Sequence, residues 1–299
     1  MRVLTTGTSG FLGKIIKNEL SKNEVFDLNR FSGFYQVDLS KNIPCLDKQF
    51  DLVIHVAGIA HSVPKTKEQI EQFYKVNVIG TLNLLNGLNR SYLPKMFVYI
   101  SSVAVYGETN AELINEESAL KAIDPYGKSK IDAEELVLNW CETNNVICTI
   151  LRLPLLAGTN PPGNLGSMIN GIKKGYYFNI AGGKAQKSMV LASDVAQCIL
   201  KVSEIGGIYN LTDGYHPTFN ELSRTISLQL GRKFVPNMPL FFAKILALIG
   251  DLIGDKFPIN SNKLSKIMEP LTFDDSKARK AFGWNPRQVL EGFNISNLN

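Results

Sequence analysis

The stretch that decides the fold is Met1-Arg-Val-Leu-Thr-Thr-Gly7-Thr-Ser-Gly10-Phe-Leu-Gly13. Its first residues, Arg2–Thr5, form a short apolar run typical of a strand, and from Phe11 the apolar residues recur at helical spacing. Glycines between a strand and a helix let the backbone approach a phosphate, and the helix N-terminus offers unpaired N–H groups to an anion. We therefore expect a pyrophosphate-binding turn here, with an ordinary strand–turn–helix as the alternative.

Further apolar runs follow along the first half of the chain. Strands are predicted at Glu24–Asn29, Gly33–Asp38, Asp51–Ala57, Lys95–Ile100 and Val146–Leu151. Helices are predicted between them, one over about 66–88 and one that Asp124 caps and Pro125 opens. Unalternating apolar strands separated by helices indicate a parallel sheet that is covered on both faces.

Three sequence features lie where predicted strands end. They are the glycine-rich turn Gly7–Gly13, Gly58, and the pair Ser101–Ser102. Ligands of parallel sheets bind outside the carboxyl ends of the strands. All three features therefore indicate one ligand-binding edge.

The composition excludes several classes of protein. The chain has 299 residues and a formal charge of +5, with its basic residues scattered, so nucleic-acid binding is not expected. Four separated cysteines and three histidines offer no zinc spacing, and no metal site is expected. The cysteines indicate thiols in a reducing compartment, and the sequence starts directly in a strand, so we expect a cytoplasmic protein without a signal peptide.

The most apolar stretch is Leu240–Gly254. Lys244 and Asp251 interrupt it, and it is shorter than a membrane span requires. We therefore expect no membrane span. A packed or capping helix is the leading interpretation, and a helix lying on a membrane surface is the alternative.

Tyr126 and Lys130 lie four residues apart, so both side chains can point into one site from one helix face. An ammonium near a phenol lowers the pKa of the phenol, which would make Tyr126 a usable acid and base. Ser102, at a strand end, can donate a hydrogen bond to a substrate oxygen. Such a Tyr–Lys pair also arises often by chance.

Taken together, these motifs resemble the extended short-chain dehydrogenase/reductase family, specifically its nucleotide-sugar epimerases, dehydratases and reductases. The motifs occur in family order as Thr6–Gly13, His55–Gly58, Ile100–Gly107 and Pro125–Lys130. The similarity extends through residues 77–85, 151–154, 193–196 and 271–286. The predicted fold is thus α/β, a Rossmann-type doubly wound parallel sheet with a smaller, mostly helical C-terminal substrate-binding domain. Residues 1–157 and about 186–215 would form the NAD(P)-binding domain, and about 158–185 with 216–299 the substrate-binding domain.

The resemblance implies a site for NADP or NAD. The three glycines of the turn would wrap the pyrophosphate, Asp38 and Leu39 would contact the adenine end, and Lys130 would bridge the nicotinamide ribose hydroxyls. Asn77 is included on this basis, with helix packing as its alternative role. The implied cofactor-binding residues are Gly7, Ser9, Gly10, Phe11, Leu12, Gly13, Arg30, Asp38, Leu39, Val56, Ala57, Gly58, Asn77, Ile100, Ser101, Tyr126, Lys130, Pro154 and Leu155.

The resemblance also implies a nucleotide-sugar substrate and a catalytic set of Ser102, Tyr126 and Lys130. Tyr126 would exchange the proton of a sugar hydroxyl or keto oxygen that Ser102 orients. The implied substrate-binding residues are Ser102, Val103, Tyr126, Asn164 and Leu165. A homodimer is implied as well, paired through the helices around 66–88 and 125–141.

Two departures from the family pattern refine this hypothesis. Dehydratases of the family carry Asp-Glu directly after the site serine or threonine, whereas this chain has Val103-Ala104, which cannot move protons. NAD specificity usually comes from an acidic residue that ends the second strand, but Asn29-Arg30 stands there and Asp27 comes too early. Arg30 could pair with a 2′-phosphate, which favours NADP, or it could be a solvated loop residue.

The resulting expectation is an oxidoreductase that acts at C4 of a nucleotide-diphosphate sugar. A 4-keto-6-deoxysugar reductase is preferred because the chain is compact and carries Arg30. An NAD-dependent 4-epimerase is the alternative. A non-catalytic dinucleotide-binding protein is a further alternative, which the presence of Ser102, Tyr126 and Lys130 disfavours.

Overall fold

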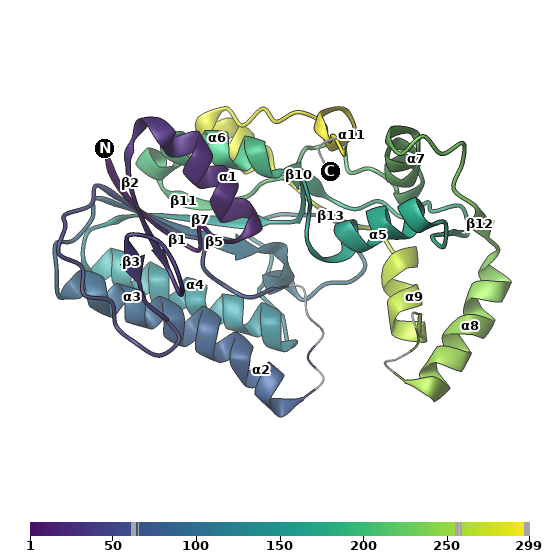
Figure 1. Ribbon diagram of the computed structural model, residues 1–299, viewed down its shortest axis with the longest axis horizontal. Coiled ribbons are helices and arrows are strands. Elements are labelled where there is room, and N and C mark those ends of the chain that lie inside the picture. Colours follow the sequence, from purple (N-terminus) through teal and green to yellow (C-terminus); the bar gives the residue numbers. More distant parts are fainter. Residues whose placement is uncertain (61–63, 65, 255–256, 258, 296–299) are drawn as a thin grey trace.

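The chain is organised around one parallel sheet, with a smaller cluster of helices beside it (Figure 1). The computed structural model describes residues 1–60, 64, 66–254, 257 and 259–295. The seven-stranded sheet has the order β11-β7-β5-β4-β1-β2-β3, and every neighbouring pair is parallel. Its strands are β1 (Arg2–Thr6), β2 (Glu24–Asn29), β3 (Tyr35–Gln36), β4 (Leu52–His55), β5 (Met96–Ser102), β7 (Ile147–Leu153) and β11 (Gly207–Asn210). The predicted doubly wound sheet is confirmed.

Helices cover both faces of this sheet, as its apolar strands require. On one face α1 (Phe11–Glu19), α6 (Ala192–Ile205) and α10 (Ser276–Phe282) share a core with the strands. On the other face lie α3 (Gly80–Asn89) and α4 (Pro125–Thr143) (Figure 1). The short η1 (Leu20–Lys22) ends α1.

Two predicted helices have the expected ends. The helix predicted over 66–88 is a continuous run of α2 (Lys67–Phe73), a π-helical segment η2 (Tyr74–Ile79) and α3. The Asp124 side chain caps α4 by accepting a hydrogen bond from the backbone N–H of Gly127 at 3.0 Å. Pro125 occupies the first helical position, where its missing N–H costs no hydrogen bond. Asp124 and Pro125 together therefore fix the start of α4 next to the site.

The smaller part lies beyond the carboxyl ends of the strands, at the right of Figure 1. It contains two pairs of short parallel strands. These are β8 (Leu155–Ala157) with β10 (Met189–Leu191), and β9 (Asn179–Ile180) with β12 (Asn237–Met238). Its helices are α5 (Gly163–Lys174), α7 (Phe219–Gln229), α8 (Leu240–Ile253), α9 (Ser261–Met268) and α11 (Val289–Gly292).

The C-terminal segment differs from the predicted division of the chain. After α9, β13 (Leu271–Phe273) pairs with β6 (Ala111–Ile114), and α10 and Trp284 join the core under the main sheet. The indole N–H of Trp284 donates to the carbonyl of Thr212 at 2.9 Å. Residues 271–284 therefore pack with the Rossmann part, although they fall within the range assigned to the substrate-binding domain.

The apolar stretch from residue 240 forms α8, which has 14 residues. Within the described ranges, no helix combines the length and the apolar character that crossing a bilayer requires.

Candidate functional site

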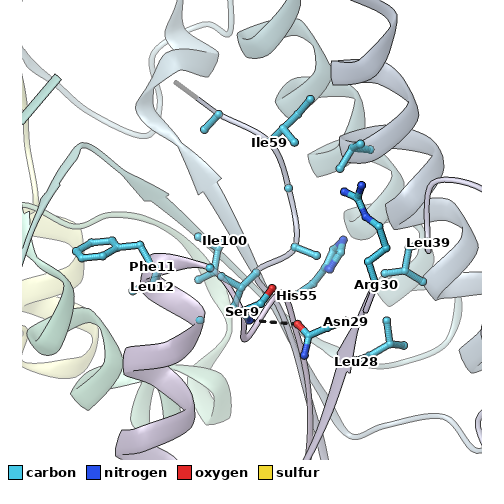
Figure 2. Close-up of a pocket in the computed structure, with 18 of the residues that line it drawn as sticks. Ser9, Phe11, Leu12, Leu28, Asn29, Arg30, Leu39, His55, Ile59 and Ile100 are labelled. Atoms are coloured by element: carbon cyan, nitrogen blue, oxygen red, sulfur yellow. Dashed lines mark hydrogen bonds between the residues drawn. The ribbon is translucent and has the colours of Figure 1, made fainter. Parts of the chain in front are cut away.

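A cleft of about 530 Å³ lies at the carboxyl ends of β1, β2, β4, β5 and β7. Figure 2 shows its walls, with Phe11 and Leu12 on one side and Arg30 and Leu39 on the other. Most of the expected site residues line it: Gly7, Ser9, Gly10, Phe11, Leu12, Gly13, Arg30, Asp38, Leu39, Val56, Ala57, Gly58, Ile100, Ser101, Ser102, Tyr126, Lys130 and Pro154. Residues separated by well over a hundred positions in the chain thus meet at the edge that the sequence indicated.

The glycine turn is shaped as a cradle that side chains would fill. Gly7 has φ +72°, and a Cβ added there would lie 2.7 Å from the backbone nitrogen of Ala57. A Cβ on Gly13 would lie 2.1 Å from the carbonyl oxygen of Gly7. Gly10 is the N-cap of helix α1 and provides no side-chain cap, so the first N–H groups of the helix remain available to an anion. The turn therefore fits a dinucleotide pyrophosphate.

At the end of β2, the acidic residue is already engaged within the protein. The Asp27 carboxylate accepts hydrogen bonds from Lys17 at 2.8 Å and from Thr8 at 3.2 Å. Asn29 holds the glycine turn, since its side-chain oxygen accepts from the Ser9 N–H at 3.2 Å (Figure 2). Arg30 is exposed and extends along the cleft beside Leu39. The group that faces the cleft from this strand end is thus a cation.

Lys130 is fully enclosed at the other end of the cleft. Its Nζ donates to the carbonyl of Ile100 at 2.7 Å and lies 4.2 Å from the centre of the Tyr99 ring. Burial lowers the pKa of Lys130 to about 7, and the nearby Glu134 carboxylate partly opposes this by raising it. Lys130 therefore titrates near neutral pH.

Tyr126 stands at the start of α4, with its ring 5.8 Å from that of Phe73. Burial raises the pKa of Tyr126, a hydrogen bond with Ser102 lowers it, and the charge of Asp124 raises it. The expected lowering of this pKa by Lys130 is not found. Lys130 is instead hydrogen-bonded to the Ile100 carbonyl, and burial shifts it toward its uncharged form. Ser102 does face Tyr126, and it also caps η3 (Val103–Tyr106).

Asn77 does not line the cleft. Its side chain accepts from the Ile59 N–H at 2.9 Å and donates to Ser129 Oγ at 2.9 Å, and Ser129 Oγ donates to the carbonyl of Tyr126 at 2.8 Å. It therefore fastens the loop after β4 to the first turn of α4. This is the packing role that the sequence left open.

Four other expected residues also lie away from the cleft lining. Leu155 packs against the core of the smaller part, because successive side chains of a strand point to opposite sides, and its neighbour Leu156 lines the cleft instead. Val103 packs beside the core formed around Tyr106. Leu165 is 1% exposed within a core cluster on α5, and Asn164 is exposed on the first turn of the same helix.

The cleft also contains residues that sequence reasoning missed. Most follow β2 and β3 or lie one position from an expected residue, so a systematic reading of every strand end would have found them. They are Leu28, Asn29, Phe31, Ser32, Val37, Ser40, His55, Ile59, Ala60, Val76, Leu153, Leu156 and Pro162.

A doubly wound parallel sheet with a glycine cradle and a Tyr–Lys helix at one cleft defines an α/β enzyme of the dinucleotide-dependent class. Residues 3–212 match the family model described as the NAD dependent epimerase/dehydratase family, and the chain belongs to that family. Its membership of the extended short-chain dehydrogenases/reductases, predicted from the motifs, is thereby confirmed.

Individual relatives span almost the whole chain. Among curated proteins, the chain is similar to N-acetyl-α-D-glucosaminyl-diphospho-ditrans,octacis-undecaprenol 4-epimerase of Escherichia coli O157:H7, with 24% identity over 97% of this chain and 92% of the relative. Among solved structures, RMD from Pseudomonas aeruginosa complexed with NADPH has a TM-score of 0.74 and 24% identity over 97% of this chain and 95% of that one. UDP-glucose 4-epimerase from Thermotoga maritima with UDP-glucose has a TM-score of 0.75 and 21% identity over 98% and 96%. The two structures share the fold of this chain.

Proposed function

We propose that this enzyme is an NADPH-dependent reductase that acts on the C4 keto group of a nucleotide-diphosphate 4-keto-6-deoxysugar. The observation that carries the proposal is Arg30. It faces the cleft directly after β2, where an acidic residue would mark NAD specificity, and the nearby Asp27 is engaged by Lys17. A reductase consumes NADPH, whereas an epimerase takes a hydride from the sugar and returns it to the same sugar. A preference for NADPH therefore favours the reductase.

The residues present fit such a cofactor. The glycine turn and the open start of α1 would hold its pyrophosphate, Arg30 a 2′-phosphate, and Lys130 the nicotinamide ribose. When bound, the cofactor would supply hydride.

The chain's own contribution is proton transfer and orientation. The Tyr126 phenol would donate its proton to the C4 oxygen, and the Ser102 hydroxyl would orient that oxygen. The raised pKa of Tyr126 keeps the phenol protonated before reduction, which is the state that an acid requires. Val103 and Ala104, which follow Ser102, carry no titratable group, so elimination of water has no acid or base there.

A second candidate is a 4-epimerase that oxidises C4 and returns the hydride to the other face of the sugar. The observation that favours it is the Escherichia coli relative, a 4-epimerase similar over nearly the full length of both chains. The substrate in the name of this relative carries its sugar on a polyprenol diphosphate. On that precedent, the sugar offered to this chain would be carried on a lipid diphosphate, and the same Ser102, Tyr126 and Lys130 would serve.

One experiment separates the two reactions. The purified chain is incubated with UDP- or GDP-4-keto-6-deoxysugar and NADPH, and the absorbance of reduced nicotinamide is followed. A stoichiometric loss of absorbance with formation of the 4-hydroxy sugar is expected. Interconversion of C4 epimers with no added reduced cofactor would refute the reductase and support the epimerase.

We also propose that the chain forms a homodimer through α2, α3 and α4, as the family resemblance implies. Exposed apolar side chains on these helices and on η2, which joins α2 to α3, support this: Ile70, Tyr74, Leu82 and Leu138. Light scattering of the wild type and of Tyr74→Glu tests it, with a dimer expected for the first and a monomer for the second. A wild-type monomer would exclude the interface.

The division into domains remains a proposal as well. Residues 1–157 and about 186–215 would bind the cofactor, and 158–185 with residues from 216 onward would bind the sugar. The pairing of β13 with β6, and the packing of α10 and Trp284 in the core of the main sheet, support assigning residues 271–284 to the cofactor-binding part.

A further inference from the structure

Helix α8 buries small residues and exposes large apolar ones, the opposite of an ordinary amphipathic helix. The residues that it turns toward the protein are small, namely Ala243, Ala247 and Gly250, all of which are buried. A Cβ on Gly250 would lie 1.8 Å from the carbonyl oxygen of Ile259, so this side must stay small. The large apolar residues face outward, from Phe241, which is 69% exposed, to Leu252, which is 89% exposed.

This outward face forms a continuous surface. Its members recur along α8 at helical spacing, and exposed Phe234 precedes the helix. Soluble chains seldom leave contiguous large apolar side chains in water, because each loses the free energy of burial. We call this surface the α8 face; it consists of Phe241, Phe242, Ile245, Leu248, Ile249, Leu252 and Ile253.

The segment that contains α8 carries more basic than acidic side chains, and Lys244 lies on α8 itself. Among the described residues from 230 to 270, five side chains are basic and two are acidic. One of the acidic residues, Asp251, accepts hydrogen bonds from the backbone and side chain of Ser261. The basic residues are Arg232, Lys233, Lys244, Lys263 and Lys266, and the acidic ones are Asp251 and Glu269.

We propose that the α8 face docks the enzyme on the surface of an anionic phospholipid bilayer. A helix of 14 residues spans about 21 Å, less than the roughly 30 Å of a hydrocarbon core, so it lies in the interface and does not cross it. Phenylalanines and leucines enter the acyl boundary, and Lys244 on the same helix meets lipid phosphates.

Charge distinguishes this partner from a second copy of the chain. A two-fold contact through the α8 face would bring this positively charged segment of each copy, with its Lys244, into one interface. Like charges across an interface oppose association, whereas an anionic lipid surface offers the complementary charge.

The test uses the full chain and flotation with vesicles of phosphatidylcholine alone or mixed with phosphatidylglycerol. Binding is expected to the mixed vesicles and to weaken with added salt. The variant Leu248→Glu/Leu252→Glu should lower the bound fraction by more than about tenfold, because two apolar contacts are replaced by charges that lipid phosphates repel. The matched control is Leu228→Glu on α7, since Leu228 is 62% exposed and Leu248 61%.

Each outcome has a definite meaning. Loss of flotation in the α8 variant but not in Leu228→Glu supports the proposal. Absence of wild-type binding, equal binding of both variants, or a dimer that only the α8 variant dissociates would overturn it. Thermal unfolding confirms that both variants fold. Reductase turnover on a water-soluble substrate is measured separately, so failure of vesicle binding is distinguishable from failure of the proposed reaction.

Discussion

Burial determines the ionisation of the two groups that α4 brings into the cleft. It raises the pKa of Tyr126 and lowers that of Lys130 to about 7, so both tend toward their neutral forms. A hydrogen bond with Ser102 lowers the pKa of Tyr126. Lys130 is held by the Ile100 carbonyl, in a position set by the end of β5.

The first prediction concerns Tyr126. Tyr126→Phe should lower kcat by about two to four orders of magnitude, because the proton donor is removed. Cofactor affinity should change little, because the aromatic ring beside Phe73 is kept. Turnover and a fluorescence titration with NADPH measure the two quantities. Unchanged turnover would exclude Tyr126 as the acid.

The second prediction concerns Arg30. Arg30→Ala should lower the NADPH-to-NADH ratio of kcat/KM by about 10- to 100-fold, the value of a charge-assisted hydrogen bond. The control is Arg2→Ala. Arg2 lies at the start of β1, at the end of the strand away from the cleft, and it pairs with Glu24. Equal losses with both cofactors would show that Arg30 does not read the 2′-phosphate.

At the scale of elements, one buried ion pair ties α4 to the sheet. Arg152 on β7 donates to Glu134 on α4 at 2.7 Å, and the two side chains are 4% and 2% exposed. Ser101, next to Ser102, also donates to Glu134, and Arg152 donates to the hydroxyl of Tyr106 at 3.1 Å. The network holds β5, β7 and α4 in register, and these are the elements that present Ser102, Tyr126 and Lys130.

The third prediction follows from this network. Arg152→Met should lower the free energy of unfolding by about 3–5 kcal/mol, because it leaves the Glu134 carboxylate buried without its cation. Glu134→Leu/Arg152→Met should cost less than the sum of the single variants, since no unpaired charge remains. Urea unfolding measures all three. Additive losses would mean that the pair is not coupled.

At the scale of the whole molecule, distant segments close the structure over one core. Strand β13 returns to pair with β6, and Trp284 reaches Thr212 beneath the main sheet. His55 lies in the middle of this assembly, bound through its ring nitrogens to Thr6 on β1 and Thr81 on α3 at 2.7 and 2.9 Å. Burial lowers the pKa of His55 to about 3.

The fourth prediction concerns acid stability. Between pH 6.5 and about 3 the unfolded chain protonates His55 and the folded chain does not, so stability is lost as pH falls through this window. This group should contribute a loss of about 1.4 kcal/mol between pH 7.5 and 5.5. Urea unfolding of the wild type and His55→Gln at both pH values isolates it. An equal pH dependence in the two proteins would contradict the assignment.

Much of the sheet and of the cleft was predictable from local pattern. The strands predicted within the first half of the chain all form, and the helix starts at Asp124–Pro125 as capping chemistry predicts. Leu155, Leu165 and Asn77 lie outside the cleft lining, because the direction of each side chain places it elsewhere. Spacing along the chain does not say which neighbour a side chain meets, and a one-residue change in a strand reverses its face.

By itself, the sequence determined the α/β class, the glycine turn and the Tyr–Lys pair, because each depends on residues close together in the chain. Only the tertiary structure decided that Lys130 meets the Ile100 carbonyl, that Asp27 is engaged by Lys17, and that α8 turns its large apolar residues outward. These contacts join segments far apart in sequence, and their energies depend on burial, which exists only once the chain has folded.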